Sequence, residues 1–224
     1  SGKTEVYLQV AQKVIDKGQQ VLILVPEISL TPQMIERFQS RFGQDIGIYH
    51  SGLNDQEKYE QYQRVRNDEV DIVVGTRSCV FLPFSNLGLI VFDEEHDTSF
   101  KQESVPYYHA REVALKRAET HQCPVILGSA SPSLETYAKA LKGVYHLLEL
   151  PQRINRSFPE IKVIDMKAQL SALKDDVISQ ALDEAIRLAL SKNEQIILLL
   201  NRRSYSPIVQ CQSCMEALQC PNCD

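Results

Sequence analysis

Three acids and a histidine stand in a row, as Asp93, Glu94, Glu95 and His96, directly after the apolar run Leu89–Phe92. An unbroken apolar run predicts a buried strand, and α/β folds place ligands at the carboxyl ends of such strands. A first acid there can hold Mg²⁺, and a second can orient and deprotonate an attacking water. The row therefore predicts Asp93 as metal ligand, Glu94 as general base and His96 as γ-phosphate sensor. The alternative is an acidic loop without chemistry.

The first four residues, Ser1, Gly2, Lys3 and Thr4, match the last four positions of a phosphate-binding loop. Glycine lets backbone N–H groups close on phosphate oxygens, lysine reaches the β- and γ-phosphates, and the threonine hydroxyl binds Mg²⁺. Such a loop must open a helix, and the helical spacing of residues 5–17 supplies one. Four residues alone could be a solvated tail, but together with the acidic row they predict a site for ATP and Mg²⁺.

The elements that position these residues alternate between strands and helices through residues 1–150. Apolar runs predict strands at residues 21–25, 46–49, 72–75, 89–92 and 125–127. Helices are expected at residues 5–17, 32–42 after a Thr31 cap, 54–67, 109–121 and 133–142. The alternation predicts an α/β fold with a mostly parallel sheet and flanking helices. Together with the phosphate-loop residues it predicts a P-loop NTPase.

The pattern changes after residue 150. A stretch with two prolines at 151–159 reads as a linker. A strand at 161–165, a helix at 179–191 and a strand at 195–200 then suggest a second α/β lobe. We therefore expect a nucleotide-binding lobe at 1–150, a linker and the beginning of a second lobe at 151–209, and a cysteine cluster at 210–224.

Bulk properties narrow the class of protein. No apolar run approaches the ~18–20 residues of a membrane span, and no signal peptide is visible, so no membrane association is expected. The net charge of −5 argues mildly against nucleic-acid binding, although it averages over all faces and does not exclude contacts on one of them. The first residue is Ser rather than Met, and we expect an internal piece of a longer protein.

Two further short motifs each follow an expected strand. They hold Thr76, Arg77 and Ser78 in the first case, and Gly128, Ser129 and Ser131 in the second. With the phosphate loop and the acidic row, this order of motifs resembles superfamily 2 helicases. The resemblance implies that the first motif touches DNA and that the second couples the nucleotide to the DNA strand.

Residues 25–33, 50–53 and 201–207 narrow the resemblance to the primosomal protein N′ family of bacterial replication-restart helicases, and it covers essentially the whole chain. At three positions the sequence departs from the family pattern, each time with one small residue in place of another. Ser131 stands where Thr is commoner, and Ser204 and Ser206 stand where Gly and Ala are expected. The resemblance implies two RecA-like lobes with ATP between them. It also implies 3′-to-5′ DNA helicase activity on single-stranded and forked DNA, in primosome assembly and restart of stalled forks. Single-strand binding protein, other primosome proteins and a bacterial cytoplasmic location follow from it as well.

An aromatic stretch follows the acidic row. It contains Phe100, Lys101, Tyr107, Tyr108 and Arg111. Aromatic faces stack on bases and cations follow the phosphates, and the resemblance implies an aromatic-rich loop that couples DNA binding to hydrolysis. The alternative is that the two tyrosines pack in front of the next helix. Two alternatives are also open for Pro26 and Thr31: they face a DNA channel, or they cap the next helix.

The C-terminal cysteines Cys211, Cys214, Cys220 and Cys223 form two C-x₂-C pairs, a spacing typical of zinc ligands. One tetrahedral Zn²⁺ held by all four is one reading, but the gap between the pairs is short for a zinc ribbon. The resemblance implies eight cysteines and two Zn²⁺ in the full-length protein, so that each pair is a half-site. A redox motif fits poorly, because this stretch does not suit a strand-to-helix turn.

Two other functions remain open from the sequence. One is an ATPase on the same lobes that remodels RNA or protein. The other is a zinc-dependent DNA-binding module that has no turnover. DNA-stimulated ATP hydrolysis separates all three.

Overall fold

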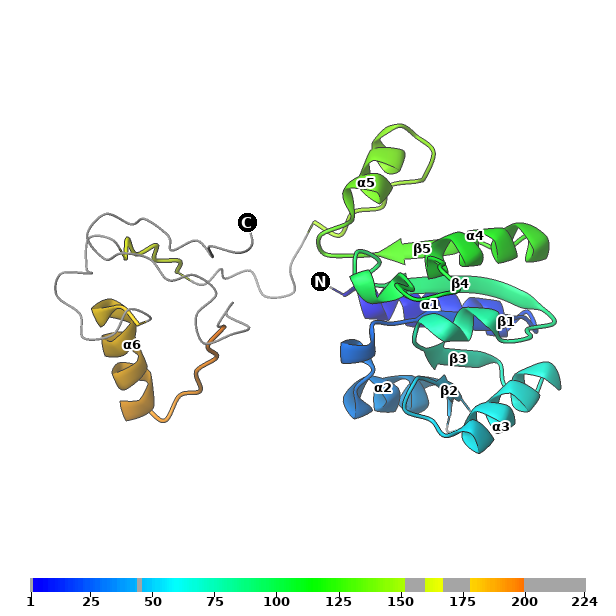
Figure 1. Ribbon diagram of the computed structural model, residues 1–224, viewed down its shortest axis with the longest axis horizontal. Coiled ribbons are helices and arrows are strands. Elements are labelled where there is room, and N and C mark those ends of the chain that lie inside the picture. Colours follow the sequence, from blue (N-terminus) through cyan, green and yellow to red (C-terminus); the bar gives the residue numbers. More distant parts are fainter. Residues whose placement is uncertain (1, 44–45, 152–159, 167–177, 200–224) are drawn as a thin grey trace, which may run out of the picture. The chain divides into compact units, whose positions relative to one another are not determined.

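Five parallel strands form the centre of the first part of the chain, in the order β2-β3-β1-β4-β5 (Figure 1). The strands are β1 (Gln20–Leu24), β2 (Gly47–Tyr49), β3 (Ile72–Gly75), β4 (Leu87–Asp93) and β5 (Val125–Gly128). The computed structural model describes residues 2–43, 46–151, 160–166 and 178–199. The chain divides into two compact units, residues 1–157 and residues 158–224, and each has its own description below.

Helices cover both faces of this sheet because its strands are apolar on both sides, as buried parallel strands require. The helices of the first unit are α1 (Lys3–Ile15), α2 (Pro32–Phe42), α3 (Asp55–Arg66), α4 (Ala110–His121) and α5 (Leu134–Leu141), with 3₁₀ turns at η1 (Glu27–Ser29), η2 (Arg77–Phe81) and η3 (Thr98–Phe100). On one face α1 and α2 bury Tyr7, Leu8 and Phe38 against the strands. On the other face α3 and α4 bury Val65 and Ala114, so the unit has three layers.

Local signals in the sequence fix where several helices begin. Thr31 Oγ1 accepts the N–H of Met34 at 3.3 Å, with proline at the first helical position of α2. Asn54 and Glu57 form a reciprocal capping box at the start of α3. These caps satisfy N–H groups that the first turn of a helix leaves without partners, so the expected helix starts are confirmed.

The face that α1 buries centres on Tyr7, Leu8 and Ala11. Val10 and Ile15 are partly buried and pack against the same core cluster, whereas Val6 is 40% exposed. Ala11 is fully buried, and its small side chain permits close approach of α1 to the sheet. The inner face of α1 thus combines these aliphatic side chains with the Tyr7 ring.

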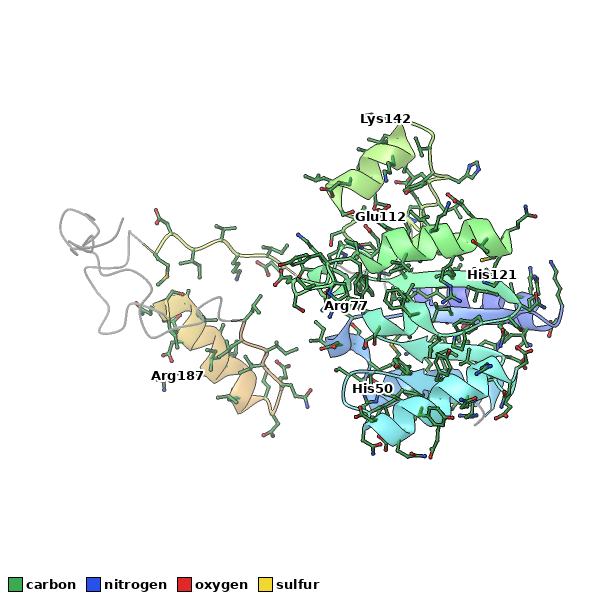
Figure 2. The ribbon with its side chains drawn as sticks, turned by 45° about the vertical axis from the view of Figure 1, so that its right-hand side comes forward. His50, Arg77, Glu112, His121, Lys142 and Arg187 are labelled. Atoms are coloured by element: carbon green, nitrogen blue, oxygen red, sulfur yellow. The ribbon has the colours of Figure 1, made fainter. Side chains whose placement is uncertain are left out.

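Parallel pairing brings the carboxyl ends of all five strands to one edge of the sheet. Arg77 follows β3 at this edge, whereas His121 at the end of α4 precedes β5 at the opposite edge (Figure 2). The edge also receives Asp93 at the end of β4, which pairs with Gly128 at the end of β5. The candidate chemistry of the sequence therefore gathers at one rim.

The second unit has one described helix, α6 (Gln180–Ser191), which confirms the helix expected at residues 179–191. Ser179 caps it, with its Oγ accepting the Leu182 N–H at 3.1 Å. The strands expected at residues 161–165 and 195–200 are not formed in the described parts of those segments. Val163 is 94% exposed and Ile197 is 96% exposed. A strand needs a neighbour for its N–H and C=O groups, and the described residues provide none. Apolar composition showed that these segments suit burial, but it could not show that a partner strand lies beside them.

Candidate active site

The N-terminus of α1 meets the carboxyl end of β4. Lys3 Nζ lies 2.6 Å from Glu94 Oε1 and 4.0 Å from Asp93 Oδ1, so residues 90 positions apart form one charged cluster. Gly2 precedes the helix with φ +87 and gives it no side-chain cap, which leaves the first N–H groups of α1 available to an anion. The structure thus unites the two halves of the predicted ATP site within its described residues, while Ser1 lies outside them.

Asp93 is held by a buried tyrosine of α1. The Tyr7 hydroxyl donates to Asp93 Oδ1 at 3.2 Å. Burial raises the pKa of Asp93 above its ordinary value, while the nearby Lys3 ammonium acts in the opposite direction. Burial and the neighbouring carboxylates also raise the pKa of Tyr7, so its hydroxyl stays a proton donor. Tyr7 could not be singled out from the sequence, since a tyrosine on an apolar helix face is an ordinary core residue.

Gly128 makes room for this tyrosine. A Cβ at position 128 would lie 1.7 Å from the Tyr7 hydroxyl and 2.7 Å from its Cζ. No real contact is that short, so any larger residue would displace the Tyr7 ring. Gly128, expected to couple the nucleotide to DNA, therefore has a steric role beside Asp93.

We predict that Gly128→Ala lowers the free energy of unfolding by about 1–3 kcal/mol, as overpacking of a filled site does. It should also lower ATP turnover, because a displaced Tyr7 no longer orients Asp93. Thermal unfolding and steady-state hydrolysis measure the two effects. Tyr7→Phe is the control, since it removes the hydrogen bond without crowding and should unfold at a higher temperature than Gly128→Ala. An unchanged unfolding temperature in Gly128→Ala would contradict the steric role.

Glu94 has a left-handed backbone with φ +50, which is uncommon for a residue other than glycine. Its neighbour His96 lies with Nδ1 3.6 Å from Glu94 Oε2 and 2.6 Å from Ser129 Oγ. The Ser129 hydroxyl also accepts the N–H of Ser131 at 2.9 Å. His96 thus links the carboxylate of the expected general base to the motif after β5.

Glu95, to which the sequence analysis assigned no role, is 2% exposed. Its carboxylate accepts the Ser133 N–H at 2.7 Å and the Thr136 hydroxyl at 2.9 Å, and it pairs with Arg111 Nη1 at 3.2 Å. The signal that could have revealed it is the third acid in the row, because an acid directly after a strand must be exposed or paired.

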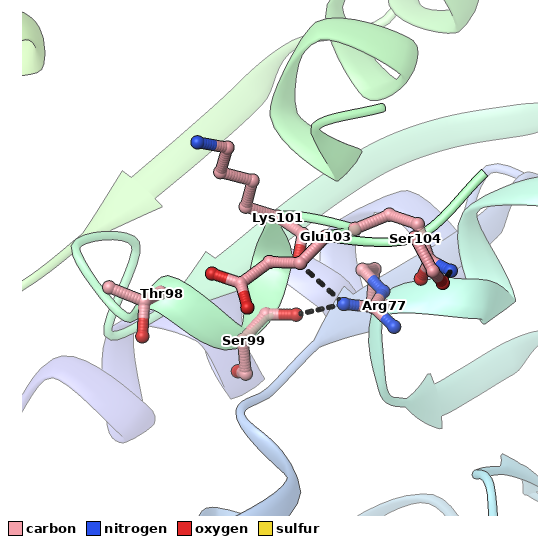
Figure 3. Close-up of a pocket in the computed structure, with 7 residues that line it drawn as sticks. Arg77, Thr98, Ser99, Lys101, Glu103 and Ser104 are labelled. Atoms are coloured by element: carbon pink, nitrogen blue, oxygen red, sulfur yellow. Dashed lines mark hydrogen bonds between the residues drawn. The ribbon is translucent and has the colours of Figure 1, made fainter. Parts of the chain in front are cut away.

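Arg77 does not point freely into solvent. Its Nη1 donates to the carbonyl oxygens of Ser99 at 3.0 Å and Lys101 at 2.7 Å (Figure 3). Its guanidinium also lies 5.9 Å from the ring centre of Tyr108, which packs edge-on against Phe81. Arg77 thereby fastens the turn after β3 to the aromatic stretch.

An open pocket of about 460 Å³ lies beside Arg77, and Ser99 and Lys101 also line it. Glu103 and Ser104 complete its wall, and the Arg77 guanidinium is directed toward the backbone of Ser99 and Lys101 (Figure 3). Both the turn after β3 and the loop after the acidic row contribute to the pocket. It is therefore a shared surface of two segments that are separate motifs in the sequence.

The other residues expected to contact or sense DNA fall into two groups. Exposed ones are Ser78, Lys101, Tyr107 and Ser131. Buried ones are Pro26, Thr76 and Phe100. Phe100 is fully buried against Phe92, so the expectation that its face stacks on a base is wrong for this conformation. Thr31 caps α2, which confirms the helix-capping alternative.

Arg111 also differs from its expected position. Its side chain is 13% exposed and is directed to Glu95 and Thr136 rather than outward. A guanidinium engaged with a buried carboxylate is a poor phosphate contact. The cause is the neighbouring acid, which the spacing of the aromatic stretch could not reveal.

The four cysteines Cys211, Cys214, Cys220 and Cys223 lie outside the described residues. Within the described ranges no group of three or more His, Cys, Asp or Glu side chains could hold a metal ion. The zinc expectation therefore stays a prediction.

None of the helices in the described ranges is long and apolar enough to cross a membrane.

Residues 1–140 match the family described as DEAD/DEAH box helicase. Over its whole length the chain is 52% identical to Replication restart protein PriA of Bacillus subtilis and 50% identical to that of Synechocystis, and it spans 28% of the length of each. The protein of that name from Haemophilus influenzae is 43% identical, with 30% of its length covered. These relatives confirm the expected resemblance.

Among solved structures, RecG bound to a three-way DNA junction is similar with a TM-score of 0.46 and 24% identity, over 64% of this chain and 18% of RecG. The family match spans the phosphate loop, the acidic row and both strand-end motifs. These are the segments that the fold brings to one rim. The chain belongs to the DEAD/DEAH box helicase family.

Proposed function

We propose that this chain is the ATP-hydrolysing part of a DNA helicase that moves 3′ to 5′ and acts in primosome assembly and restart of stalled replication forks. The observation that carries the proposal is the contact of Lys3 with Glu94 at the end of β4. The names of the relatives support the biological role. Because the chain spans under a third of their length, activity, substrates and partners of the whole protein are part of the proposal.

ATP would bind at the N-terminus of α1, with Lys3 on its β- and γ-phosphates. Asp93 and the Thr4 hydroxyl would hold Mg²⁺, an oxygen-ligand set of the kind that this ion takes beside phosphates. The site fits such a cation, because the partly buried Asp93 and Glu94 carboxylates already gather an ammonium group between them. The ion supplies neutralisation of phosphate charge when bound.

Glu94 is the proposed general base. In the structure Glu94 Oε1 accepts a hydrogen bond from the Lys3 ammonium at 2.6 Å. Arriving phosphates compete for the Lys3 ammonium and release Glu94, which can then accept the proton of the attacking water. His96 lies between Glu94 and Ser129, so a movement of the Glu94 carboxylate on its release from Lys3 would alter the contacts of His96.

DNA would lie along the rim beside the open pocket. Lys101, Ser78 and Tyr107 are exposed there, and Tyr107 is 73% exposed. A charged surface with an accessible aromatic ring suits a single strand, whose phosphates need cations and whose bases need stacking faces. Thr76, Arg77 and Tyr108 would shape this surface from beneath it, and Gly128, Ser129 and Ser131 would connect it to the hydrolysis site.

Two parts of the proposal extend beyond the described residues. The four C-terminal cysteines would serve two Zn²⁺ sites, each completed by further cysteines. Forked DNA, single-strand binding protein and other primosome proteins would be the partners, in the bacterial cytoplasm. The names of the bacterial relatives support this setting.

The test is ATP turnover in a protein of the relatives' full length that carries these residues. We expect single-stranded DNA to stimulate hydrolysis well above the effect of RNA of equal sequence. Stronger stimulation by RNA or by a protein client would favour the remodelling ATPase instead. No turnover with any polymer, together with intact DNA binding, would favour a zinc-dependent DNA-binding module.

Substitutions of Tyr107 and Tyr108 should have different effects. We predict that Tyr107→Ala weakens single-stranded DNA binding by about 1–3 kcal/mol, the typical contribution of one stacked base. It should also lower DNA stimulation more than basal turnover. Tyr108→Ala should instead lower the unfolding temperature, because that ring packs on Phe81 and Arg77. Fluorescence anisotropy with labelled DNA and thermal unfolding measure both. Equal loss of basal and stimulated turnover in Tyr107→Ala would make it a packing residue.

A further inference from the structure

The third acid of the row is the most completely bound carboxylate at this rim. We propose that Glu95 is a positioning residue for hydrolysis, and that it acts with Arg111, Ser133 and Thr136 as a clamp that fixes the backbone of Glu94. The inference rests on the proposed function, because it takes Glu94 as the general base. It assigns Arg111 to the hydrolysis site rather than to DNA.

The groups that contact the Glu95 carboxylate are hydrogen-bond donors. Its side chain has no exposed area, and both of its oxygens accept hydrogen bonds. The donors are the Ser133 N–H, the Ser133 and Thr136 hydroxyls and the Arg111 guanidinium. A carboxylate accepts only, and this set of donors compensates for its removal from water. An uncharged amide would direct an N–H₂ group toward groups that themselves donate.

The clamp acts on Glu94 through the backbone on either side of it. Asp93 is fixed in the sheet, paired with Gly128 of β5. The Glu95 N–H donates to the Gly128 carbonyl oxygen at 3.0 Å, and its side chain is bound as described above. Glu94 thus stands between two anchored residues in a left-handed conformation. Such conformations persist where the surrounding contacts over-determine them, and the Glu95 carboxylate supplies several of those contacts.

The same clamp reaches the loop proposed to contact DNA and the segment proposed to connect DNA to the hydrolysis site. Arg111 is in the first turn of α4, directly after the loop that carries Tyr107 and Tyr108. Ser133 caps α5, directly after the segment of Ser129 and Ser131. A movement of either segment that shifts its clamp residue would also shift Glu95, and with it the general base. This arrangement gives a structural route from DNA occupancy to hydrolysis.

The test measures kcat, the KM for ATP and single-stranded DNA affinity of Glu95→Gln and Arg111→Gln in a protein of full family length. Displacement of a catalytic group by about 1 Å can cost about a hundredfold. We therefore expect kcat to fall by about ten- to a hundredfold with and without DNA, while the KM for ATP and DNA affinity are little changed. Arg111→Lys keeps the charge and should recover part of kcat. The double variant should be no slower than the slower single variant, because the two residues act as one unit.

Arg117→Gln is the control for a purely structural role. Arg117 lies on the same helix, bonds to the Val80 carbonyl oxygen and covers the Phe84 ring. Its loss should lower the unfolding temperature with little change in kcat. An equal kcat loss in Arg117→Gln and Arg111→Gln at equal unfolding temperatures would overturn the proposal. So would weakened DNA binding with unchanged basal kcat in Arg111→Gln.

Failure of the clamp and failure of the proposed function give different results. If Glu94→Gln abolishes turnover but Glu95→Gln does not lower kcat, the clamp alone is wrong. If Glu94→Gln retains full turnover, the assignment of the general base is wrong, and the clamp with it.

Discussion

Replacement of Glu94 by glutamine is expected to lower the kcat of DNA-stimulated ATP hydrolysis by about 10²–10⁴-fold, the usual contribution of a general base. The amide keeps the size of the side chain but cannot accept the proton of the attacking water. Lys3, which now lies 2.6 Å from Glu94 Oε1, loses an anionic partner in the variant. ATP binding should therefore persist or tighten, because less competition remains for the ammonium that binds phosphate.

The measurement is steady-state hydrolysis with saturating single-stranded DNA, beside binding of a fluorescent ATP analogue. Glu119→Gln is a matched control, since that carboxylate is exposed on α4 and pairs with the exposed Lys116 at 2.7 Å. It should hydrolyse ATP at the unmodified rate. Retention of DNA-stimulated turnover in Glu94→Gln would remove Glu94 from the role of base.

The sheet was predictable from sequence because its strands are short apolar runs bounded by turn residues. Val21–Val25 and Ile72–Gly75 are buried on both faces, and a strand of that kind has no alternating pattern to misread. The helices were predictable from their caps, such as Thr31 and Asn54. The strand order could not be predicted, because pairing depends on contacts between segments distant along the chain.

In the second unit the same apolar signal gave the wrong result. Residues 161–165 and 195–199 carry alternating or continuous apolar side chains, yet they form no strand. Apolar composition reports what a segment can bury, whereas a strand also requires a neighbour with free backbone groups. The helix at Gln180–Ser191 was predictable because its hydrogen bonds lie within the segment.

The candidate site was only half predictable. Residue types placed Lys3 with Asp93 and Glu94, because phosphate and Mg²⁺ require opposite charges at one location. The sequence could not predict which arginine side chains would bind to other groups of the same chain. Arg77 and Arg111 both looked like phosphate contacts, but each is bound to groups of this chain. The neighbours that bind them are carbonyl oxygens and a buried acid, and neither can be located without the fold.

The arginines connect the motifs to one another. Arg77 ties the turn after β3 to the loop after the acidic row, and Arg111 ties that row to the start of α5. Separate sequence motifs therefore form one continuous set of contacts along the rim. Substitution of one motif should affect the function of its neighbours, so mutational effects across the rim should be non-additive.

Lys3→Ala is expected to abolish measurable turnover, with a loss of at least about 10²–10³-fold, the usual effect of removing one group that stabilises transition-state charge. Two consequences of the structure combine in this variant. The γ-phosphate loses its ammonium partner, and the Asp93 and Glu94 carboxylates lose the cation that now lies between them. Unlike Glu94→Gln, this variant should bind the ATP analogue weakly, while its affinity for single-stranded DNA is retained.

Lys13→Ala controls for the loss of a lysine from the same helix, because Lys13 is exposed in the last turn of α1. It should retain turnover and analogue binding. The pair of active-site variants then divides binding from chemistry: Glu94→Gln binds ATP without hydrolysing it, and Lys3→Ala does neither. Tight analogue binding by Lys3→Ala would mean that Lys3 serves only to hold the two carboxylates, and the phosphate contact would have to come from the N–H groups at the start of α1.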